Sequence, residues 1–214
     1  MSKKYLSLIF AAALFIGSSV TANAVPITGL FNTGVDGSGN VLPNGSLDPH
    51  YTVLENGNAP AVLLSSPHGT YIPNSASSKW VWQQSNGLPI NVNRTFRLTF
   101  DLSGLDHTSA NISGLWAVDN RGLDILINGN STGNTNGGFR AYSPFSINSG
   151  FVAGINTLDF VTNDFGGLAA FRVDSIAGTA NVLQPRPNDR VNEPAGLALI
   201  GLFALAGMAA RRRR

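Results

Sequence analysis

An alternation of apolar and polar residues over positions 95–102 is the most regular pattern in the chain. The apolar positions are Phe96, Leu98, Phe100 and Leu102, and the polar positions between them are Arg97, Thr99 and Asp101. A period of two residues is that of a β-strand, because successive side chains point to opposite faces. The pattern therefore predicts a strand that buries one face and exposes the other.

Eight further segments combine apolar residues with flanking turn residues. They predict strands at residues 51–55, 61–65, 79–83, 112–118, 123–128, 139–147, 156–162 and 169–176. Turn-forming residues separate them at Asn56-Gly57, Asn86-Gly87, Ser103-Gly104, 120–122, Asn128-Gly129, 148–150 and 164–167. Asn and Gly tolerate the positive φ angles of tight turns. No interior stretch keeps a helical period for three turns, so we predict an all-β fold, an antiparallel β-sandwich of jelly-roll type.

The chain begins with the three parts of a secretory signal peptide, which we assign to residues 1–24. Lys3 and Lys4 form a basic start, residues 5–17 are apolar, and Ala22-Asn23-Ala24 has the small residues of a cleavage site. We therefore expect signal peptidase to cut after Ala24 and an exported protein to begin at Val25. An uncleaved N-terminal helix is the alternative.

The chain ends in the order of a membrane-targeting tail. Residues 184–194 contain three prolines and several charges, which is typical of a semi-rigid, solvated spacer. Residues 195–210 are uncharged and apolar, and four arginines follow at 211–214. At about 1.5 Å per residue this helix would cover roughly 24 Å of a hydrocarbon core about 30 Å thick. We expect a short transmembrane helix with a cytoplasmic basic cluster, because arginines at a helix end stay on the cytoplasmic side.

The motif ahead of the apolar segment consists of Val191, Asn192, Glu193 and Pro194. Together with the helix and the basic terminus it resembles the PEP-CTERM sorting signal. Glu193 and Pro194 match the Pro-Glu-Pro-type motif, and Asn192 stands where a proline is usual. The resemblance implies transient anchoring in the inner membrane and removal of the tail by an exosortase-type processing enzyme. The protein would then reach the cell surface or the extracellular matrix; a permanent tail anchor is the alternative.

Charge excludes a nucleic-acid partner for the mature domain. Eight of the fourteen Lys and Arg lie in residues 25–190, against eleven of the twelve Asp and Glu, which gives a net charge near −3. The basic groups that remain are in the two targeting segments, so no basic stripe is left to contact phosphates. The chain has no cysteine. We expect one domain, residues 25–183, that is stabilised by its core alone.

A second resemblance covers roughly residues 95–180. It rests on residues 114–120 (GLWAVDN), residues 123–129 (LDILING), Phe145 and residues 151–163 (FVAGINTLDFVTN). These phrases are similar to the galactose-binding-like jelly roll, which also occurs as the sugar-binding domain of many glycoside hydrolases. In the phrase 154–160, we expect Gly154 to turn the chain, Asn156 to bond nearby backbone, and Asp159 to face water. This favours a structural role for the phrase over ligand contact.

Carbohydrate binding needs an aromatic face flanked by polar groups. The candidates are Trp80, Trp82 and Trp116, together with the loop residues Asp119, Asn120 and Arg121. Each tryptophan has an alternative place in the core, and Asp and Asn are also common turn formers. The loop at 119–121 is the better candidate.

We find no catalytic constellation, and we expect neither enzymatic activity nor a cofactor or metal. His50, His68 and His107 stand alone in loop-like contexts. The domain's carboxylates are expected to face outward or to fall in turns; they are Asp101, Asp106, Asp119, Asp124, Asp159 and Asp174. A calcium ligand at Asp36 is a weaker interpretation than a plain Gly-rich loop, because the segment lacks the later acidic ligand of an EF-hand.

The sequence thus predicts an exported surface protein with a structural or carbohydrate-associated role, and exopolysaccharide as a partner. The alternative is a lectin-like module with a defined glycan, and a polysaccharide hydrolase comes third. Each class has its own discriminating test: glycan binding for the lectin, and turnover of a polysaccharide for the hydrolase.

The tail interpretation can be tested by mass. Replacing both Glu193 and Pro194 with Ala should leave the protein inserted but uncut, whereas deleting residues 211–214 should weaken retention and orientation. Mass spectrometry of the surface-released form gives its C-terminus. A released wild-type protein that still ends at Arg214 would establish the permanent anchor instead.

Overall fold

The computed structural model describes residues 23–184. Residues 1–22 of the predicted signal peptide, most of the spacer, the sorting motif, the apolar segment 195–210 and the basic cluster 211–214 lie outside the described residues. Within residues 23–184, no helix is long and apolar enough to cross a membrane. The described region is built from β-strands.

The strands are β1 (Ala24–Pro26), β2 (Leu47–Val53), β3 (Ala59–Leu63), β4 (Val81–Trp82), β5 (Asn93–Asp101), β6 (Leu105–Asp119), β7 (Arg121–Ile127), β8 (Asn130–Ser131), β9 (Ser143–Ile147), β10 (Ile155–Asn163) and β11 (Ala170–Val182). One short 3-10 turn, η1 (Leu54–Asn56), connects β2 to β3. All strand pairs are antiparallel, in the order β8-β7-β10-β5-β2-β3-β4-β11-β6-β9, and β1 pairs with β11. The prediction of an all-β antiparallel fold is confirmed.

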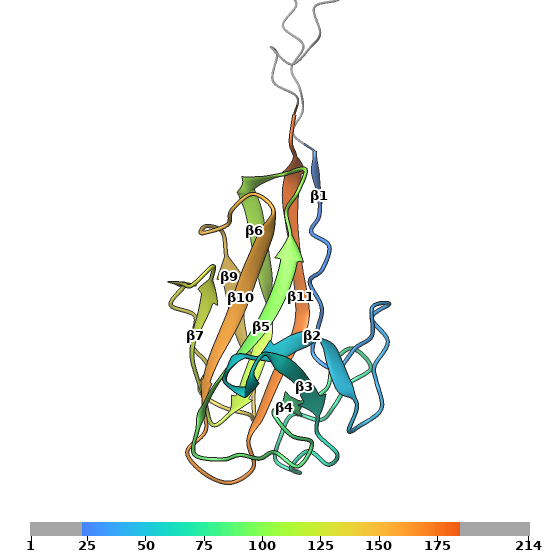
Figure 1. Ribbon diagram of the computed structural model, residues 1–214, viewed down its shortest axis with the longest axis vertical. Coiled ribbons are helices and arrows are strands. Elements are labelled where there is room, and N and C mark those ends of the chain that lie inside the picture. The colour runs from blue at the N-terminus through green and yellow to red at the C-terminus, as the bar shows by residue number, and fades with distance from the viewer. Residues whose placement is uncertain (1–22, 185–214) are drawn as a thin grey trace, which may run out of the picture.

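The continuous sheet folds over on itself, so that its two halves face one another across one core. Figure 1 shows β5, β6, β10 and β11 along the long axis, with β2, β3 and β4 beside the lower part. Aromatic rings cross between the halves: Phe171 of β11 stacks on Phe96 of β5 at 4.4 Å and lies 5.1 Å from Phe160 of β10. Trp116 of β6 also lies 5.7 Å from Phe160. The arrangement is consistent with a β-sandwich.

The alternation in β5 has the predicted consequence. The four apolar side chains from Phe96 to Leu102 are at most 2% exposed, whereas Thr99 and Asp101 are exposed. On one side β10 pairs with the whole of β5, and on the other side β2 pairs with residues 96–98. The apolar face of β5 is therefore a central part of the core.

Other strands differ from their predicted bounds. The segment predicted at 139–147 is a strand only from Ser143, and Pro144 is tolerated there because β9 is at the edge of the sheet. The predicted turn at 120–122 is a direct passage from β6 into β7. Gly122 is needed there for space, since a Cβ would lie 2.2 Å from the Trp116 ring.

The phrase at 154–160 has the structural role that we expected. Gly154 has a φ of 78°, and the Asn156 amide donates to the carbonyls of Val152 and Gly154 at 2.8 Å each. The expectation for Asp159 was wrong: it is 3% exposed. Asp159 does lie on the outward side of β10, but Arg97 stands opposite it on β5 and covers it with two hydrogen bonds of 2.7 Å.

Both ends of the described region lie at one end of the sandwich. Ala24 of β1 pairs with Asn181 of β11, and β6 runs antiparallel to β11, so that Asp119 lies beside Ala170 at the opposite end. The fifteen residues of β6 span roughly 45 Å at about 3.3 Å per residue. We call the end where β6 passes into β7 and β10 passes into β11 the tip; it is at the bottom of Figure 1.

Replacing Phe100 with Asp should unfold the domain. The side chain is 2% exposed, and an unpaired buried charge destabilises by several kcal/mol, a large share of a typical stability of about 5–15 kcal/mol. Thr99→Asp is the matched control, because Thr99 is the exposed neighbour on the same strand. Thermal melting followed by circular dichroism compares the two; equal melting temperatures would contradict the assigned faces of β5.

Candidate functional site

The structure places the three tryptophans in the core. Trp80, Trp82 and Trp116 are each 0% exposed. Trp80 packs under Tyr71 at 4.8 Å, and Trp82 packs on Phe96 at 5.3 Å. Because no ring face reaches solvent, none of the three can stack on a sugar. Their candidacy as a binding platform is corrected, and the core alternative describes them.

The loop candidates lie together at the tip. Asp119 is 5% exposed, Asn120 is half-buried and Arg121 is exposed. Asn120 joins β6 to the end of β10, because its backbone N–H donates to the Asn163 carbonyl at 3.2 Å. Its side-chain oxygen accepts the N–H of Phe165 at 2.9 Å. Asn120 thereby fixes the loop 164–169 between β10 and β11, which we call the tip loop.

A pocket of about 230 Å³ opens at the tip. Its walls come from the segment between β3 and β4, from the end of β6, from the segment before β9 and from the tip loop. The lining residues are His68, Thr70, Tyr71, Asp119, Asn120, Phe139, Gly166, Gly167 and Leu168. Two predicted site residues, Asp119 and Asn120, thus line one cavity, which we call the tip pocket.

Asp119 contradicts the expectation that the carboxylates face outward. Burial raises its pKa, and the charge of Asp164 adds to that increase, while a hydrogen bond with Tyr71 and the charge of His68 oppose it. Tyr71 Oη lies 2.6 Å from Asp119 Oδ2 and 2.5 Å from the Leu168 carbonyl oxygen. The pKa of Tyr71 is raised too, first by burial and then by Asp119. Burial does not alternate in this part of β6, because all four residues from Trp116 to Asp119 are buried.

Asp164 is a second buried carboxylate at the tip, which the sequence pattern placed in a plain turn. It is 1% exposed, and its Oδ2 accepts the backbone N–H of Asn91 at 2.6 Å. Burial raises its pKa, whereas hydrogen bonds from Asn91 and Gly166 act in the opposite direction. One oxygen of each carboxylate, Asp119 Oδ1 and Asp164 Oδ1, is buried without a hydrogen-bond partner. Such oxygens are costly when they carry charge.

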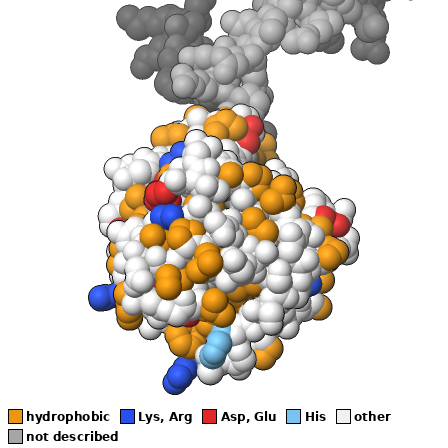
Figure 2. Space-filling view, turned by 60° about the horizontal axis from the view of Figure 1, so that its bottom comes forward, with side chains coloured by type: hydrophobic (Ala, Val, Ile, Leu, Met, Phe, Trp, Pro, Cys, Tyr) orange, Lys and Arg blue, Asp and Glu red, His pale blue; other side chains and the backbone are white. Residues whose placement is uncertain are grey.

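The tip also exposes apolar side chains, which sequence reasoning missed. Phe165 is 65% exposed, Leu88 is 41% exposed and Leu168 is 38% exposed. The signal in the sequence was an aromatic residue inside the Gly-rich turn 164–167. Figure 2 brings this end forward and shows apolar side chains interrupted by a histidine and a few basic groups, with few carboxylates in view.

The histidines differ in their surroundings. His68 is exposed, as expected, but it lines the tip pocket, and its Nδ1 lies 2.8 Å from Thr70 Oγ1. His50 lies in β2 and not in a loop, and its ring stacks on Phe31 at 3.6 Å. His107 lies in β6. No three His, Asp or Glu side chains among residues 23–184 come together as a metal-ligand set. Asp36 binds its own loop by accepting the N–H groups of Ser38 and Asn40.

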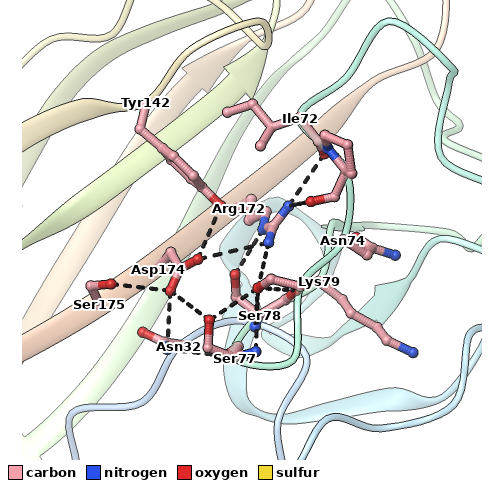
Figure 3. Close-up of polar contacts among 12 residues, drawn as sticks. Asn32, Ile72, Asn74, Ser77, Ser78, Lys79, Tyr142, Arg172, Asp174 and Ser175 are labelled. Atoms are coloured by element: carbon pink, nitrogen blue, oxygen red, sulfur yellow. Dashed lines mark hydrogen bonds and ion pairs between the residues drawn. The ribbon is translucent and has the colours of Figure 1, made fainter.

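A buried cluster around Arg172 supports the tip pocket from behind. Arg172 is 1% exposed and donates to the Pro73 carbonyl at 2.7 Å and to Ser78 Oγ at 2.8 Å. Figure 3 shows its guanidinium between the segment 72–78 and Asp174, whose carboxylate lies 3.7 Å away. Tyr142 also donates to Asp174 at 3.2 Å. Every group of the pair has partners, so the cluster is a structural clamp on the segment that carries Tyr71.

No protein-family model and no curated protein matches the chain. The geometry alone therefore defines what the tip can do. An exposed aromatic ring beside hydrogen-bonding side chains is an arrangement that suits a ligand with both apolar C–H faces and hydroxyl groups.

Replacing Arg172 with Met should destabilise the protein by about 3–5 kcal/mol, because the change removes the hydrogen bond to the buried Pro73 carbonyl and leaves Asp174 without its opposite charge. Arg121→Met, at an exposed position, should shift stability by no more than about 0.5 kcal/mol. Urea unfolding measures both. Equal stabilities would show that the segment 72–78 does not depend on the guanidinium.

Proposed function

We propose that this protein is an exported, non-enzymatic surface protein of the galactose-binding-like jelly-roll type, and that its tip associates with carbohydrate of the cell surface or extracellular matrix. The observation that supports this most directly is that Phe165, which is 65% exposed, directly precedes Gly166 and Gly167 in the lining of the tip pocket. The proposal keeps the loop at 119–121, which the sequence pattern favoured, and replaces the buried tryptophans with Phe165 as the aromatic surface.

The chemistry of the tip fits a sugar. The exposed side chains of Phe165 and Leu168 offer apolar surface for C–H faces. The tip pocket, which Leu168 and His68 help to line, holds amide, hydroxyl and carboxyl groups for sugar hydroxyls. At about 230 Å³ the pocket is smaller than the roughly 300–1,000 Å³ usual for drug-sized ligands. It suits one residue at the end or side of a polysaccharide chain.

The position of the tip fits the proposed sorting route. If the tail anchors the protein, the chain leaves the sandwich at Gln184, at the end of β11 away from the tip. The long strands β6 and β11 would then hold the tip roughly 45 Å from that end. A site at the tip would face the polysaccharide and not the membrane, both before and after release by an exosortase-type enzyme.

A polysaccharide hydrolase remains the weaker candidate. A pair of catalytic carboxylates has to reach the substrate from two sides. Asp119 is the one carboxylate among the described residues that line the tip pocket, and its partner Asp164 is 1% exposed. This arrangement favours a lectin-like role over hydrolysis.

The experiment is a pair of exposed-residue variants. Phe165→Ala should weaken co-sedimentation with the producer's own exopolysaccharide by about three- to tenfold, the value of one aromatic stacking contact. Ile155→Ala is the matched control, because Ile155 is 62% exposed and lies at the other end of β10. Both variants should melt like the wild type. Binding that is unchanged in Phe165→Ala, or absent in the wild type, would remove the carbohydrate role of the tip.

A further inference from the structure

Tyr71 makes two short contacts, and its single hydroxyl proton can serve only one of them. Its hydroxyl oxygen lies 2.6 Å from Asp119 Oδ2 and 2.5 Å from the Leu168 carbonyl oxygen. A phenol has one proton to donate and two lone pairs to accept with. The Leu168 carbonyl can only accept. If Asp119 is ionised it can only accept as well, so one of the two short contacts would lack a proton.

Both short contacts can be hydrogen bonds when Asp119 carries a proton. Asp119 Oδ2 then donates to Tyr71 Oη, and Tyr71 Oη donates to the Leu168 carbonyl. The other oxygen of Asp119 supports the same assignment, because Oδ1 is buried without a partner. A neutral carbonyl-type oxygen tolerates that position better than a charged one.

We propose that Asp119 is the neutral acid in the folded protein and that its proton closes the tip loop, which opens as the pH rises. The inference concerns regulation of the tip pocket, and its role in the cell rests on the proposed function. Leu168 lies in the tip loop, and Tyr71 reaches it from the segment between β3 and β4. The chain of two hydrogen bonds thus joins three separate parts of the fold.

The loop is built to move when this chain breaks. Gly166 and Gly167 have φ angles of 135° and 84°, and a Cβ at Gly167 would meet nothing within 4 Å. Three hydrogen bonds remain near the ends of the loop, from Asp164 N–H to the Val92 carbonyl, from Phe165 N–H to Asn120 Oδ1 and from Ala169 N–H to the Gly87 carbonyl. The Tyr71 bond to Leu168 holds the part between them. Its loss leaves the middle of the loop less tethered, so that the end bonds of the Phe165 and Ala169 amides open more often.

The charged and titratable groups that act on Asp119 come from two elements. Asp164 of the tip loop raises the pKa of Asp119 by like charge, in addition to burial, which is the larger cause. The charge of His68, from the segment between β3 and β4, lowers it, as does a hydrogen bond from Asn120; a bond from Tyr71 lowers it only when Tyr71 is the donor. A carboxyl group whose folded-state pKa is raised stabilises the closed form at low pH, and the stabilisation is lost as the pH rises through that folded-state pKa.

Hydrogen exchange of the full-length chain in detergent micelles tests the proposal, with no glycan added. Rates between about pH 4 and about pH 8 are corrected for intrinsic exchange. The Phe165 and Ala169 amides should exchange about five- to tenfold faster at the upper end, the effect of losing one hydrogen bond. Asp119→Asn should keep slow exchange throughout, because its amide can donate to Tyr71 at any pH. Tyr71→Phe should exchange fast throughout.

Carbon-13 titration of the Asp side chains supplies a second readout, and its main comparison uses the wild-type protein alone. Asp119 should titrate at a higher pH than exposed Asp101, whose pKa is lowered by Ser103. Asp164→Asn should bring the Asp119 midpoint down, and Asp101→Asn should leave the loop's exchange profile unchanged. Titration of Asp119 at or below Asp101, or loop protection that does not vary with pH in the wild type, would overturn the proposal. Because no carbohydrate is involved, this result is independent of whether the tip binds a glycan.

Discussion

The burial of one guanidinium constrains much of this structure. Arg172 lies on β11, a central strand, where its neighbours along the strand are the core residues Phe171 and Val173. A buried guanidinium has to have partners for its five N–H donors. The backbone groups of the strands beside β11 are already paired within the sheet, so the partners of the guanidinium come from a segment without regular structure. The carbonyls of Ile72 and Pro73 and the hydroxyls of Ser75 and Ser78 fulfil this role.

This clamp determines where the tip pocket can be. Tyr71 directly precedes the clamped carbonyls, and Trp80 at the other end of the segment donates its indole N–H to Ile72 at 2.8 Å. Tyr71 is therefore held from behind while its hydroxyl reaches Asp119 and Leu168. The position of the segment 72–78 thus depends on Arg172 of the core strand β11, and the position of the tip loop depends in turn on that segment. A loop with two adjacent glycines has a defined shape here because it is attached to a rigid neighbour.

The sequence predicted the parts of the fold that depend on local pattern. The alternation at 96–102 specifies the faces of β5, and Asn156 was expected to bond nearby backbone, which it does. The tip could be located only in part, because burial there depends on contacts between distant segments. Asp119 looks like a turn residue in the sequence, and its covering by Tyr71 joins residues that are 48 positions apart. The sequence left two alternatives for each tryptophan, and the structure decides for the core, where Trp80 packs on Tyr71 and Trp82 packs on Phe96.

The use of the three tryptophans in the core has a consequence for the proposed ligand. With Trp80, Trp82 and Trp116 all buried, the aromatic surface of the tip loop is the single ring of Phe165. One stacking contact contributes only about 0.5–1.5 kcal/mol beyond its buried area, and a pocket of about 230 Å³ admits little more than one sugar residue. A single domain would then hold a glycan weakly. A repetitive polysaccharide changes this balance, because many copies displayed on one surface can engage the same chain, and the effective concentration of neighbouring sites raises the overall affinity by about 10²–10⁴. Weak single contacts are therefore compatible with dense display on one surface, and the proposed sorting tail would supply that display.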